Sequence, residues 1–334
     1  MIQFTVSPDA AGQRLDKLVR KALRDVPLSH VYKMFRTRKV RVNGARGRAD
    51  QLVAAGDLVV IRGDEEKLLA PPSPAERGRG RPITFKVLYE DDDVLAVDKP
   101  AGLAAHPGTG IEGATLVEMA RAYLETSDLP STEFRPSPAH RLDRETSGVV
   151  LVAKHRKAMV RLTEIFTRGD EVRKTYLAIV KGKMPRDAGI VDLPLPEHEQ
   201  SARSRAARGV NLQEAVTRWK VVSSTKEVSL LSVGIETGRT HQIRRHLEAV
   251  GHPVAGDRRY GDFAFNRLSR ARWGLRRMAL HAWKLTLPQP MTGSPLRLEA
   301  PLPVELVEVL SRANLPPPGV SEGWRHPGEG PPRT

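Results

Sequence analysis

The residues best suited to chemistry are ionisable side chains crowded into one short stretch of the chain. Residues 139–154 read AHRLDRETSGVVLVAK, in which a polar turn carrying Asp143 and Glu145 leads into an apolar strand. Active sites are often found where an ionisable cluster meets the edge of a sheet. A carboxylate placed there serves as a nucleophile, as a stabiliser of positive charge or as a general base. The turn also admits a purely structural interpretation, in which Asp143 caps it and Arg141 and Arg144 offset the carboxylates.

Arg244 is a helical arginine whose position could let it pair with a carboxylate, although an arginine on a helix is more often a surface residue. A carboxylate in a site that excludes water stays ionised when an opposite charge lies within about 4 to 6 Å. A helix is predicted over residues 240–250, and its core face consists of Ile243, Leu247 and Val250. Arg244 then lies at the border of the core, while Arg245 points toward solvent, so position 244 can reach a cleft.

The elements that must position these residues are short apolar runs broken by turns. Strands are predicted over residues 83–89, 94–99, 148–154, 174–182, 214–222, 227–235 and 278–287. Helices are predicted over residues 114–124, 157–168 and 240–250, the last stopped by Gly251. Strands outnumber helices without regular alternation, which predicts an α+β domain over residues 83–310 with a mainly antiparallel sheet. The Pro- and Gly-rich residues 311–334 are expected to form a disordered tail.

The first 62 residues predict a separate small module. Helices are predicted over residues 14–23 and 27–38, with Ser29 capping the second. A strand over residues 38–44 ends in an Asn-Gly turn, and another strand covers residues 57–61. Residues 63–82 are rich in Pro, Gly and charge and predict a linker.

The charge of the chain indicates a polyanionic partner. There are 54 Lys and Arg residues against 39 Asp and Glu, a formal net charge of +15, and residues 1–62 hold 13 of those cations and 5 of the anions. Nucleic acid is the default partner of such a surface, although charge on helices often serves only for solvation. The cations that we predict to bind RNA in this module are Arg14, Lys17, Arg20, Lys21, Lys33, Arg36, Arg38, Lys39 and Arg41.

The composition excludes several classes of function. With 0 cysteines, the chain has no disulfide, thiolate zinc site, iron–sulfur cluster or cysteine nucleophile. His241, His246 and His252 are spaced by five and six residues, which does not place two imidazoles on one helix face, so no metal site is expected. The sequence shows no signal peptide, lipidation motif or spanning apolar run of about 20 residues. We therefore expect a soluble cytoplasmic monomer with no membrane association and no obligate protein partner.

Three motifs together resemble the RluA-type pseudouridine synthase family. The string HRLDRETSG matches the family signature and places Asp143 on its catalytic aspartate. KTYLA places Tyr176, otherwise typical of a half-buried strand aromatic, on the active-site tyrosine. GRTHQIRRHL places Arg244 on the basic residue that pairs with the aspartate, and VDKPAGLAAHPG and GHPVAGDRRYG fit as well. The resemblance covers roughly residues 10–310 and implies the pseudouridine synthase fold.

The N-terminal module has a resemblance of its own. RLDKLV, KMFRTRKVRVNG and LVAAGDLVVI are similar to the S4 RNA-binding domain, which implies contacts with the backbone of structured RNA. With the ending RRYGDFAFNR, this module is most similar to the RluC-like branch of the family. That branch implies uridines of bacterial large-subunit ribosomal RNA as the substrate. The basic loop over residues 197–210 has no clear counterpart in the family.

The resemblance implies an isomerisation of uridine that needs no cofactor. The N1 glycosidic bond breaks, the uracil turns and C5 joins the ribose, with no change of redox state. The carboxylate adds to the sugar, stabilises cationic character or takes the C2′ proton, and the residues leave these three routes open. The resemblance further implies that Tyr176 stacks on the target uracil and that Arg141 intrudes where the target base has been flipped out. Arg141 could instead form a salt bridge with Asp143 or Glu145.

Two other classes of protein remain alternatives at this point. In a non-catalytic RNA-binding assembly factor, the S4-like module would bind RNA and the larger domain would be a platform. Intact motifs argue against that class. A glycoside hydrolase or nucleosidase would share the carboxylate chemistry, but it admits water to C1′ and usually needs a second carboxylate, for which Glu145 is the nearby candidate.

Overall fold

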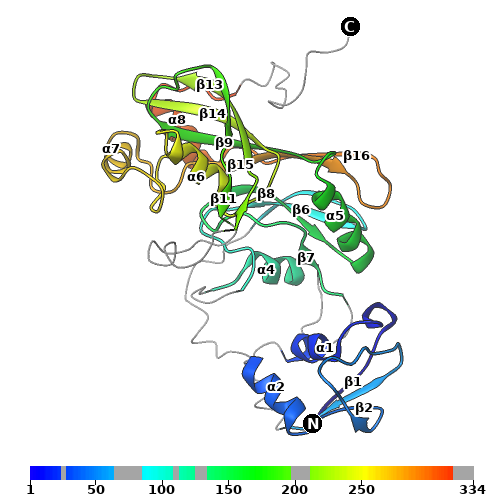
Figure 1. Cartoon of the computed structure of the whole chain (residues 1–334). Helices are drawn as coiled ribbons and strands as arrows, with labels where there is room; N and C mark the ends of the chain where they lie inside the picture. Colours follow the sequence, from blue (N-terminus) through cyan, green and yellow to red (C-terminus); the bar gives the residue numbers. More distant parts are fainter. Residues whose placement is uncertain (24–27, 64–84, 108–112, 125–133, 197–210, 319–334) are drawn as a thin grey trace. The chain divides into compact units, whose positions relative to one another are not determined.

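The computed structural model describes residues 1–23, 28–63, 85–107, 113–124, 134–196 and 211–318 (Figure 1). Contacts divide the chain into two units. The first unit comprises residues 1–82, 106–137 and 154–157, and the second comprises residues 83–105, 138–153 and 158–334. The module predicted over residues 1–62 falls within the first unit. The domain predicted over residues 83–310 supplies most of the second, but its segments 106–137 and 154–157 group with the first.

The first unit contains a small antiparallel sheet and short helices. Its strands are β1 (Ile2–Thr5), β2 (Val40–Val42), β3 (Ala45–Arg46) and β4 (Leu58–Ile61), in the order β1-β4-β2-β3. Its helices are the 3₁₀ helix η1 (Pro8–Ala10), α1 (Leu15–Ala22), α2 (Leu28–Arg36) and α4 (Leu116–Tyr123). Asn43 and Gly44 have φ angles of 49° and 79°. A two-residue hairpin turn requires such positive values, so the predicted Asn-Gly turn is confirmed.

A single apolar cluster holds the module of residues 1–62 together. It joins the buried faces of α1 and α2 to the strands, and it includes Leu15, Leu18, Val19, Val31, Met34 and Phe35. The amphipathic helices predicted over residues 14–23 and 27–38 are therefore confirmed, each with shorter ends. The side chain of Ser29, predicted to cap the second helix, lies outside the description. The predicted linker over residues 63–82 also lies outside it, apart from Gly63.

The second unit is built on a large mixed sheet. A ten-stranded sheet runs in the order β10-β13-β14-β9-β15-β8-β6-β5, with β16 beside β15 and β7 beside β8. The strands are β5 (Lys86–Glu90), β6 (Val94–Lys99), β7 (Ser137–Pro138), β8 (Ser147–Ala153), β9 (Arg173–Lys181), β10 (Ala188–Asp192), β13 (Val216–Ser224), β14 (Val228–Ile235), β15 (Leu280–Pro288) and β16 (Pro295–Glu299). A short ribbon pairs β11 (Leu195–Pro196) with β12 (Leu212–Gln213). The pairing of β15 with β8 is parallel and its neighbours are antiparallel, so the predicted α+β class is confirmed.

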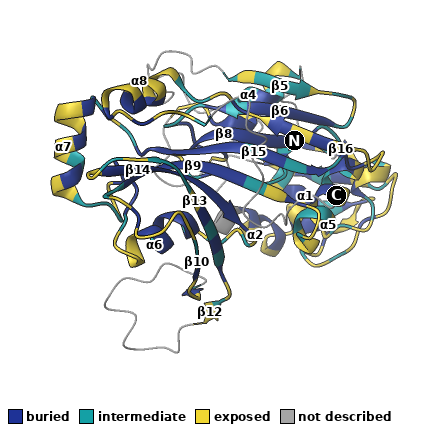
Figure 2. Ribbon diagram, turned by 90° about the horizontal axis from the view of Figure 1, so that it is seen from above, coloured by how far each residue is buried: buried dark blue, intermediate teal, exposed yellow. Residues whose placement is uncertain are grey.

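Two helices cover one face of this sheet. The helices of the unit are α5 (Arg156–Arg168), α6 (Gln242–Ala249), α7 (Phe263–Trp273) and α8 (Val304–Arg312). Residues of α7 and α8 pack with Leu177 and Ile179 of β9 in one core, and the central strands are dark blue in Figure 2. Because side chains alternate along a strand, Lys174 and Tyr176 of β9 face the other side of the sheet. That other face carries the candidate site.

Several details differ from the sequence predictions. Val250 was predicted on the core face of its helix but is 40% exposed, because α6 ends at Ala249 and Val250 already belongs to the turn at Gly251. The segment predicted as a tail begins inside α8, and Leu315 beyond it is buried. Asn314, with φ 52°, ends this helix in the left-handed conformation and turns Leu315 back onto the core. Residues 319–334 lie outside the description.

Candidate active site

Asp143 lies in a tight turn directly before β8. The carbonyl oxygen of Asp143 accepts a hydrogen bond from the backbone N–H of Thr146 at 3.1 Å. Gly148 follows with φ +117°, and a Cβ at this position would collide with the carbonyl of Ala282. Glycine therefore allows β8 to approach β15. Gly148 pairs with Ala282, and Ala282 pairs with Tyr176, so one row across three strands relates the turn of Asp143 to Tyr176.

Arg244 joins Asp143 to a second carboxylate. Its Nη1 donates to Oδ2 of Asp143 at 2.9 Å. Its Nε and Nη2 donate to the two oxygens of Asp257 at 2.6 and 3.0 Å, a bidentate pairing that fixes the plane of the guanidinium. The side chains of Asp143, Arg244 and Asp257 are 22%, 10% and 1% exposed. The arrangement therefore opens toward solvent at Asp143.

The charges of this group stabilise one another. Burial would lower the pKa of Arg244, but hydrogen bonds to Asp257 and Asp143 outweigh burial and raise that pKa above its usual value. Burial would likewise raise the pKa of Asp257, whereas hydrogen bonds from Arg244 and from the backbone N–H groups of Arg259 and Tyr260 hold it below its usual value. Asp257 thus stays ionised, and Arg244 shares its positive charge with Asp143.

An aromatic and an imidazole ring enclose the guanidinium. The Cζ of Arg244 lies 5.0 Å from the centre of the Tyr260 ring, which gives a cation–π contact. Nδ1 of His241 lies 3.1 Å from the hydroxyl of Tyr260, and Nε2 of His241 lies 3.8 Å from Oδ1 of Asp143. His241 has φ 55° at the N-terminus of α6, in the left-handed region. This conformation turns the motif loop back over Asp143.

Tyr176 is buried beside the carboxylate. Burial first, and then the negative charge of Asp143, raise the pKa of the Tyr176 phenol well above its usual value. The ring keeps its hydroxyl proton at neutral pH, so it offers an apolar face and a neutral hydroxyl. The structure brings Asp143, Tyr176 and Arg244 together, as predicted from three separate motifs.

Lys99 ties two loops together beneath the site. Its buried amine donates to the carbonyl oxygens of Pro100 and Leu103, each at 2.9 Å, and to that of Arg144 at 3.1 Å. Gly102 is bound to Arg144 in both directions, since its N–H donates to the Arg144 carbonyl and its carbonyl accepts from Nε of Arg144. Burial lowers the pKa of Lys99 to about 7. The clamp holds the residue directly after Asp143.

A second buried network holds the start of β8. Nε2 of His281 donates to the carbonyl of Ala300 at 3.1 Å, which leaves Nδ1 to accept from the hydroxyl of Ser147 at 2.8 Å. The Ser147 oxygen accepts in turn from Nη2 of Arg277 at 2.9 Å. Burial lowers the pKa of His281 to about 4, so its ring is neutral. The turn of Asp143 is thus fixed from both ends.

Arg141 and Glu145 differ from these held residues. Arg141 is exposed, and among the described residues it forms no ion pair, so the alternative salt bridge to Asp143 or Glu145 is not found. Glu145 is 53% exposed and its nearest ion-pair contact is with Arg144 at 4.0 Å. Glu145 therefore forms no ion pair with Arg244 in the described part of the chain.

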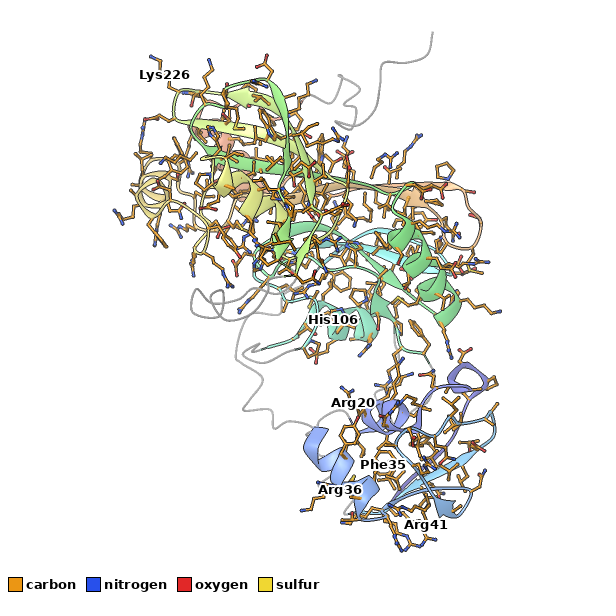
Figure 3. The ribbon with its side chains drawn as sticks, viewed as in Figure 1. Arg20, Phe35, Arg36, Arg41, His106 and Lys226 are labelled. Atoms are coloured by element: carbon orange, nitrogen blue, oxygen red, sulfur yellow. The ribbon has the colours of Figure 1, made fainter. Side chains whose placement is uncertain are left out.

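The cations predicted to bind RNA in the N-terminal module are mostly on its surface (Figure 3). The exposed members of this set are Arg14, Lys17, Arg20, Lys33, Arg36, Arg38 and Lys39. Lys21 and Arg41 are half-buried. Arg14 differs from the rest because it pairs with Asp16 at 3.0 Å. Each unit therefore carries its own candidate residues.

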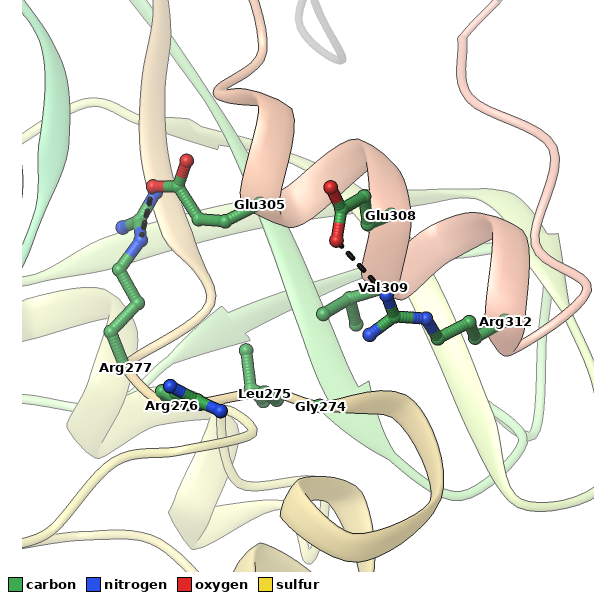
Figure 4. A pocket seen from close by; sticks show the side chains of 8 residues that line it. All are labelled: Gly274, Leu275, Arg276, Arg277, Glu305, Glu308, Val309 and Arg312. Atoms are coloured by element: carbon green, nitrogen blue, oxygen red, sulfur yellow. Dashed lines mark hydrogen bonds and ion pairs between the residues drawn. The ribbon is translucent and has the colours of Figure 1, made fainter.

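A pocket lies elsewhere in the second unit (Figure 4). It has a volume of about 440 Å³ and lies between the end of α7 and α8. Four of its charged residues form two ion pairs. Arg277 lies 3.1 Å from Glu305, and Arg312 lies 3.0 Å from Glu308. None of the predicted site residues lines it. We therefore place the candidate site at Asp143 and not in this pocket.

The described part of the chain contains neither a metal-binding cluster nor a membrane-spanning helix. No group of three His, Asp or Glu side chains there is arranged to hold a metal ion. No helix among those residues is long and apolar enough to cross a membrane.

Sequence reasoning missed the residues that support the site. Asp257 lies in GHPVAGDRRYG and Lys99 lies in VDKPAGLAAHPG. Both motifs fit the family, but the motifs alone assign no role to either residue. Ser147, Arg277 and His281 were not singled out. An acidic residue beside two arginines in a Gly-bounded turn was the available signal for Asp257.

Comparisons with known proteins show which family the chain is similar to. Residues 93–249 match the family described as RNA pseudouridylate synthase. Ribosomal large subunit pseudouridine synthase C of Vibrio vulnificus (strain CMCP6) is 36% identical over 307 residues, covering 91% of this chain and 94% of the relative. Its namesake in Escherichia coli (strain K12) is 36% identical over 319 residues, covering 92% and 95%. The structure of human RNA Pseudouridylate Synthase Domain Containing 4 has a TM-score of 0.57 and 29% identity, covering 70% of this chain and 94% of that one.

Proposed function

The chain belongs to the RNA pseudouridylate synthase family, and on this premise we propose that it converts uridines of bacterial large-subunit ribosomal RNA to pseudouridine, with Asp143 as its catalytic carboxylate. The pseudouridine synthase fold expected from the motifs is confirmed by the structural likeness. The ribosomal substrate is supported by the names of relatives that are matched over 94% and 95% of their length. The observation that carries the proposal is the Asp143–Arg244–Asp257 arrangement beside Tyr176.

This arrangement suits a carboxylate that must react while ionised. Each route open to Asp143, whether addition to the sugar, stabilisation of cationic character or removal of the C2′ proton, starts from the charged form. Arg244 stabilises that charge through one hydrogen bond and is itself fixed by two bonds to Asp257. The second Asp143 oxygen, Oδ1, is left facing Nε2 of His241 at 3.8 Å. One carboxylate oxygen is therefore held and the other is directed to the substrate.

Tyr176 supplies the surface for the base. Its ring is an apolar plane next to Asp143, which suits stacking with a uracil whose glycosidic bond lies at the carboxylate. Because the phenol keeps its proton, Tyr176 is a neutral phenol and not a phenolate when the RNA binds. Its hydroxyl can then interact with C5 of the uracil through a hydrogen bond or exchange its proton during the reaction. The hydrogen displaced from C5 leaves to solvent when C5 joins the ribose.

Arg141 is proposed to occupy the RNA stack during reaction. A base inside a helix cannot reach a carboxylate at this depth, so the target nucleotide must be flipped out. Arg141 is exposed, two residues from Asp143 and without an ion pair among the described residues, so its guanidinium can enter the space that the base leaves.

The exposed cations of the N-terminal module are proposed to bind the RNA backbone. Residues 1–62 would act as an S4-like module, residues 63–82 as a linker and residues 83–310 as the catalytic domain. We further propose a cytoplasmic monomer that needs no obligate protein partner, because Asp143, Arg244, Asp257 and Tyr176 all come from one chain.

The test is release of tritium from unmodified large-subunit ribosomal RNA labelled at uracil C5. Joining C5 to the ribose must expel that hydrogen, so wild type is expected to release tritium. Asp143→Asn keeps the shape of the side chain but removes its charge, and it is expected to release none while binding RNA normally. Asp187→Asn, at an exposed site in the second unit, is the matched control and is expected to match wild type.

The outcomes separate the parts of the proposal. No release by wild type that still binds the RNA would refute the ribosomal substrate. Release by Asp143→Asn at the wild-type rate would refute the role of Asp143. Free uracil or ribose among the products would identify a hydrolase instead.

A further inference from the structure

Lys174 of β9 is a half-buried cation that has no anionic partner among the described residues. Its Nζ lies 5.0 Å from the centre of the Phe166 ring of α5. Within the described ranges of the chain, this amine forms no hydrogen bond and no ion pair. Burial lowers its pKa, and no carboxylate opposes that effect. Three other cations of the same sheet, Lys181, Lys284 and Arg218, each have an acidic partner. Lys174 therefore differs from them.

An enclosed ammonium group without a counter-ion is unfavourable. Removing a charge from water costs free energy that hydrogen bonds or an opposite charge normally offset. The contact with Phe166 offsets part of this cost, because the face of the ring attracts a cation. The amine still lacks the oxygen atoms that an ammonium group binds with its three donors. A site of this kind suits an anion that arrives with the ligand.

The position of Lys174 connects it to the candidate active site. Lys174 precedes Tyr176 by two residues on the same face of β9, a separation of about 7 Å along a strand. Lys174 pairs with Ile235 at the end of β14, just before the loop that leads to Arg244. A Cβ built on Gly238 in that loop would lie 3.8 Å from Nζ. Burial first, and then the charge of Lys174, lower the pKa of His140, the residue that begins the Asp143 turn, to about 3.

The surrounding residues add no negative charge. The ring of His140 packs on Phe166 with 5.2 Å between ring centres, and its Nε2 accepts the backbone N–H of Leu151 at 3.1 Å. His140 is therefore a neutral wall of this cluster. The four elements that meet at Nζ are β9, α5, the loop at Gly238 and the start of the Asp143 turn.

We propose that Lys174 binds a backbone phosphate of the RNA substrate, next to the nucleotide whose base stacks on Tyr176. This inference rests on the proposed function, since an RNA bound at Asp143 brings phosphates within one nucleotide of the reacting ribose. A phosphate supplies the oxygens and the charge that the amine lacks. Lys174 thereby fixes the strand beside the target nucleotide, and it recognises RNA without reading its sequence.

The first test compares Lys174→Gln with wild type in RNA binding over a series of salt concentrations. Loss of one phosphate contact lowers the slope of log K against log salt by about 1 and weakens binding equally for different sequences. Lys226→Gln is the matched control, because Lys226 is exposed at the turn between β13 and β14 (Figure 3), the end of β14 remote from Ile235. Lys174→Arg keeps the charge and is expected to keep most of the slope.

Thermal unfolding distinguishes binding from a structural role. Because Lys174→Gln removes an uncompensated charge, its melting temperature is expected to equal or exceed that of wild type. A lower melting temperature with an unchanged salt slope would mean that Lys174 only supports Phe166, and would overturn the proposal. An equal loss of slope in Lys226→Gln would overturn it as well.

A second test alters the RNA. Single methylphosphonates, which lack the phosphate charge, are placed in turn on either side of the target uridine in a short stem-loop substrate. One position is expected to weaken binding to wild type several-fold but to have no further effect on Lys174→Gln. If every position weakens both proteins alike, the proposal fails. Tritium release by wild type from the unsubstituted stem-loop tests the proposed function separately, so the two failures cannot be confused.

Discussion

On the helices of the N-terminal module, cations such as Arg20 and Arg36 are exposed and surrounded by solvent, whereas around Asp143 the cations Lys99, Arg244 and Arg277 are enclosed and held by hydrogen bonds. Exposed charges act over about 8 to 10 Å and weaken as salt rises. Enclosed charges act through individual hydrogen bonds to their neighbours and are little affected by salt. One basic chain can therefore use its cations for two purposes, to attract a polyanion and to hold a carboxylate in place.

The two kinds of cation should respond differently to substitution. Removing an exposed cation costs little, because its charge was already solvated. Removing one member of an enclosed pair costs about 3 to 5 kcal/mol, because the remaining charge is left buried and uncompensated. Stability and turnover should therefore report on the site, and salt-dependent binding should report on the module.

Among substitutions of the cations, the largest effect is expected from Arg244→Met. This change leaves Asp257 buried without its cation and removes the hydrogen bond that holds Asp143. We expect turnover to fall by about 10²- to 10⁴-fold, equivalent to roughly 3 to 5 kcal/mol, measured by tritium release in a single turnover. Arg218→Met, which breaks an ion pair with the half-exposed Glu236, is the control and should cost less than tenfold. Comparable losses in the two variants would remove the distinction between enclosed and exposed cations.

The next effect concerns the glycine that brings two strands together. Gly148→Ala places a Cβ against the carbonyl of Ala282 at a positive φ, so we expect a loss of about 3 kcal/mol or more in the free energy of unfolding. Gly169→Ala has φ +76° with no atom within 4 Å of the added Cβ, and it should cost only about 1 kcal/mol. Urea unfolding measures both. Equal losses would show that φ alone matters and that the close approach of β8 to β15 does not.

A smaller effect is expected from acid. The pKa of His281 is about 4 in the folded protein and about 6.5 in the unfolded chain. Between these values the unfolded chain binds a proton that the folded protein does not, so this contribution is complete above about pH 6.5 and is lost as the pH falls to about 4. It amounts to about 3 kcal/mol at most.

The measurement is the free energy of unfolding of wild type and His281→Gln between about pH 7.5 and about pH 4. The difference between the two proteins should shrink as the pH falls. A constant difference would mean that His281 is not held neutral by its surroundings.

The smallest effect on turnover is expected in the module. Replacing Lys17 and Arg20 together by Gln should lower the salt slope of RNA binding by about 2 and leave the single-turnover rate of bound RNA within about twofold of wild type. Arg14→Gln should change the slope less than either single substitution, because Arg14 is already paired with Asp16. A large fall in the rate of bound RNA would show that the module contributes to the reaction itself.

Much of the fold could be predicted because buried strands carry long apolar runs. The prediction over residues 94–99 coincides with β6, and those over residues 148–154 and 174–182 lie within one residue of β8 and β9. The edge strand β10 was missed because only Val191 of its five residues is buried. Helix α7 was missed because its buried residues are Phe265, Ser269 and Trp273, a sparse set that includes a polar side chain. Elements with little apolar burial leave a weak pattern in the sequence.

The site was predictable in part for a different reason. Asp143, Tyr176 and Arg244 lie within recognisable motifs, and the structure brings them together. The role of Asp257 depends on the bend that returns the chain to Arg244 across 13 residues, and that of Lys99 on a contact with Arg144 across 45 residues. Partnerships of this kind are set by tertiary packing, which spacing within a motif does not encode.

The parallel contact between β8 and β15 also determines when the Asp143 turn can become ordered during synthesis of the chain. Ser147 and His281 are separated by 134 residues, so the strand that carries the reactive turn emerges long before its neighbour. At about 5 to 20 residues per second, the interval is on the order of ten seconds. The module at the N-terminus has all of its own strands by residue 61 and needs no later segment for its apolar cluster. A nascent chain should therefore acquire its basic surface early, and its capacity to react only when the last third of the polypeptide has been made.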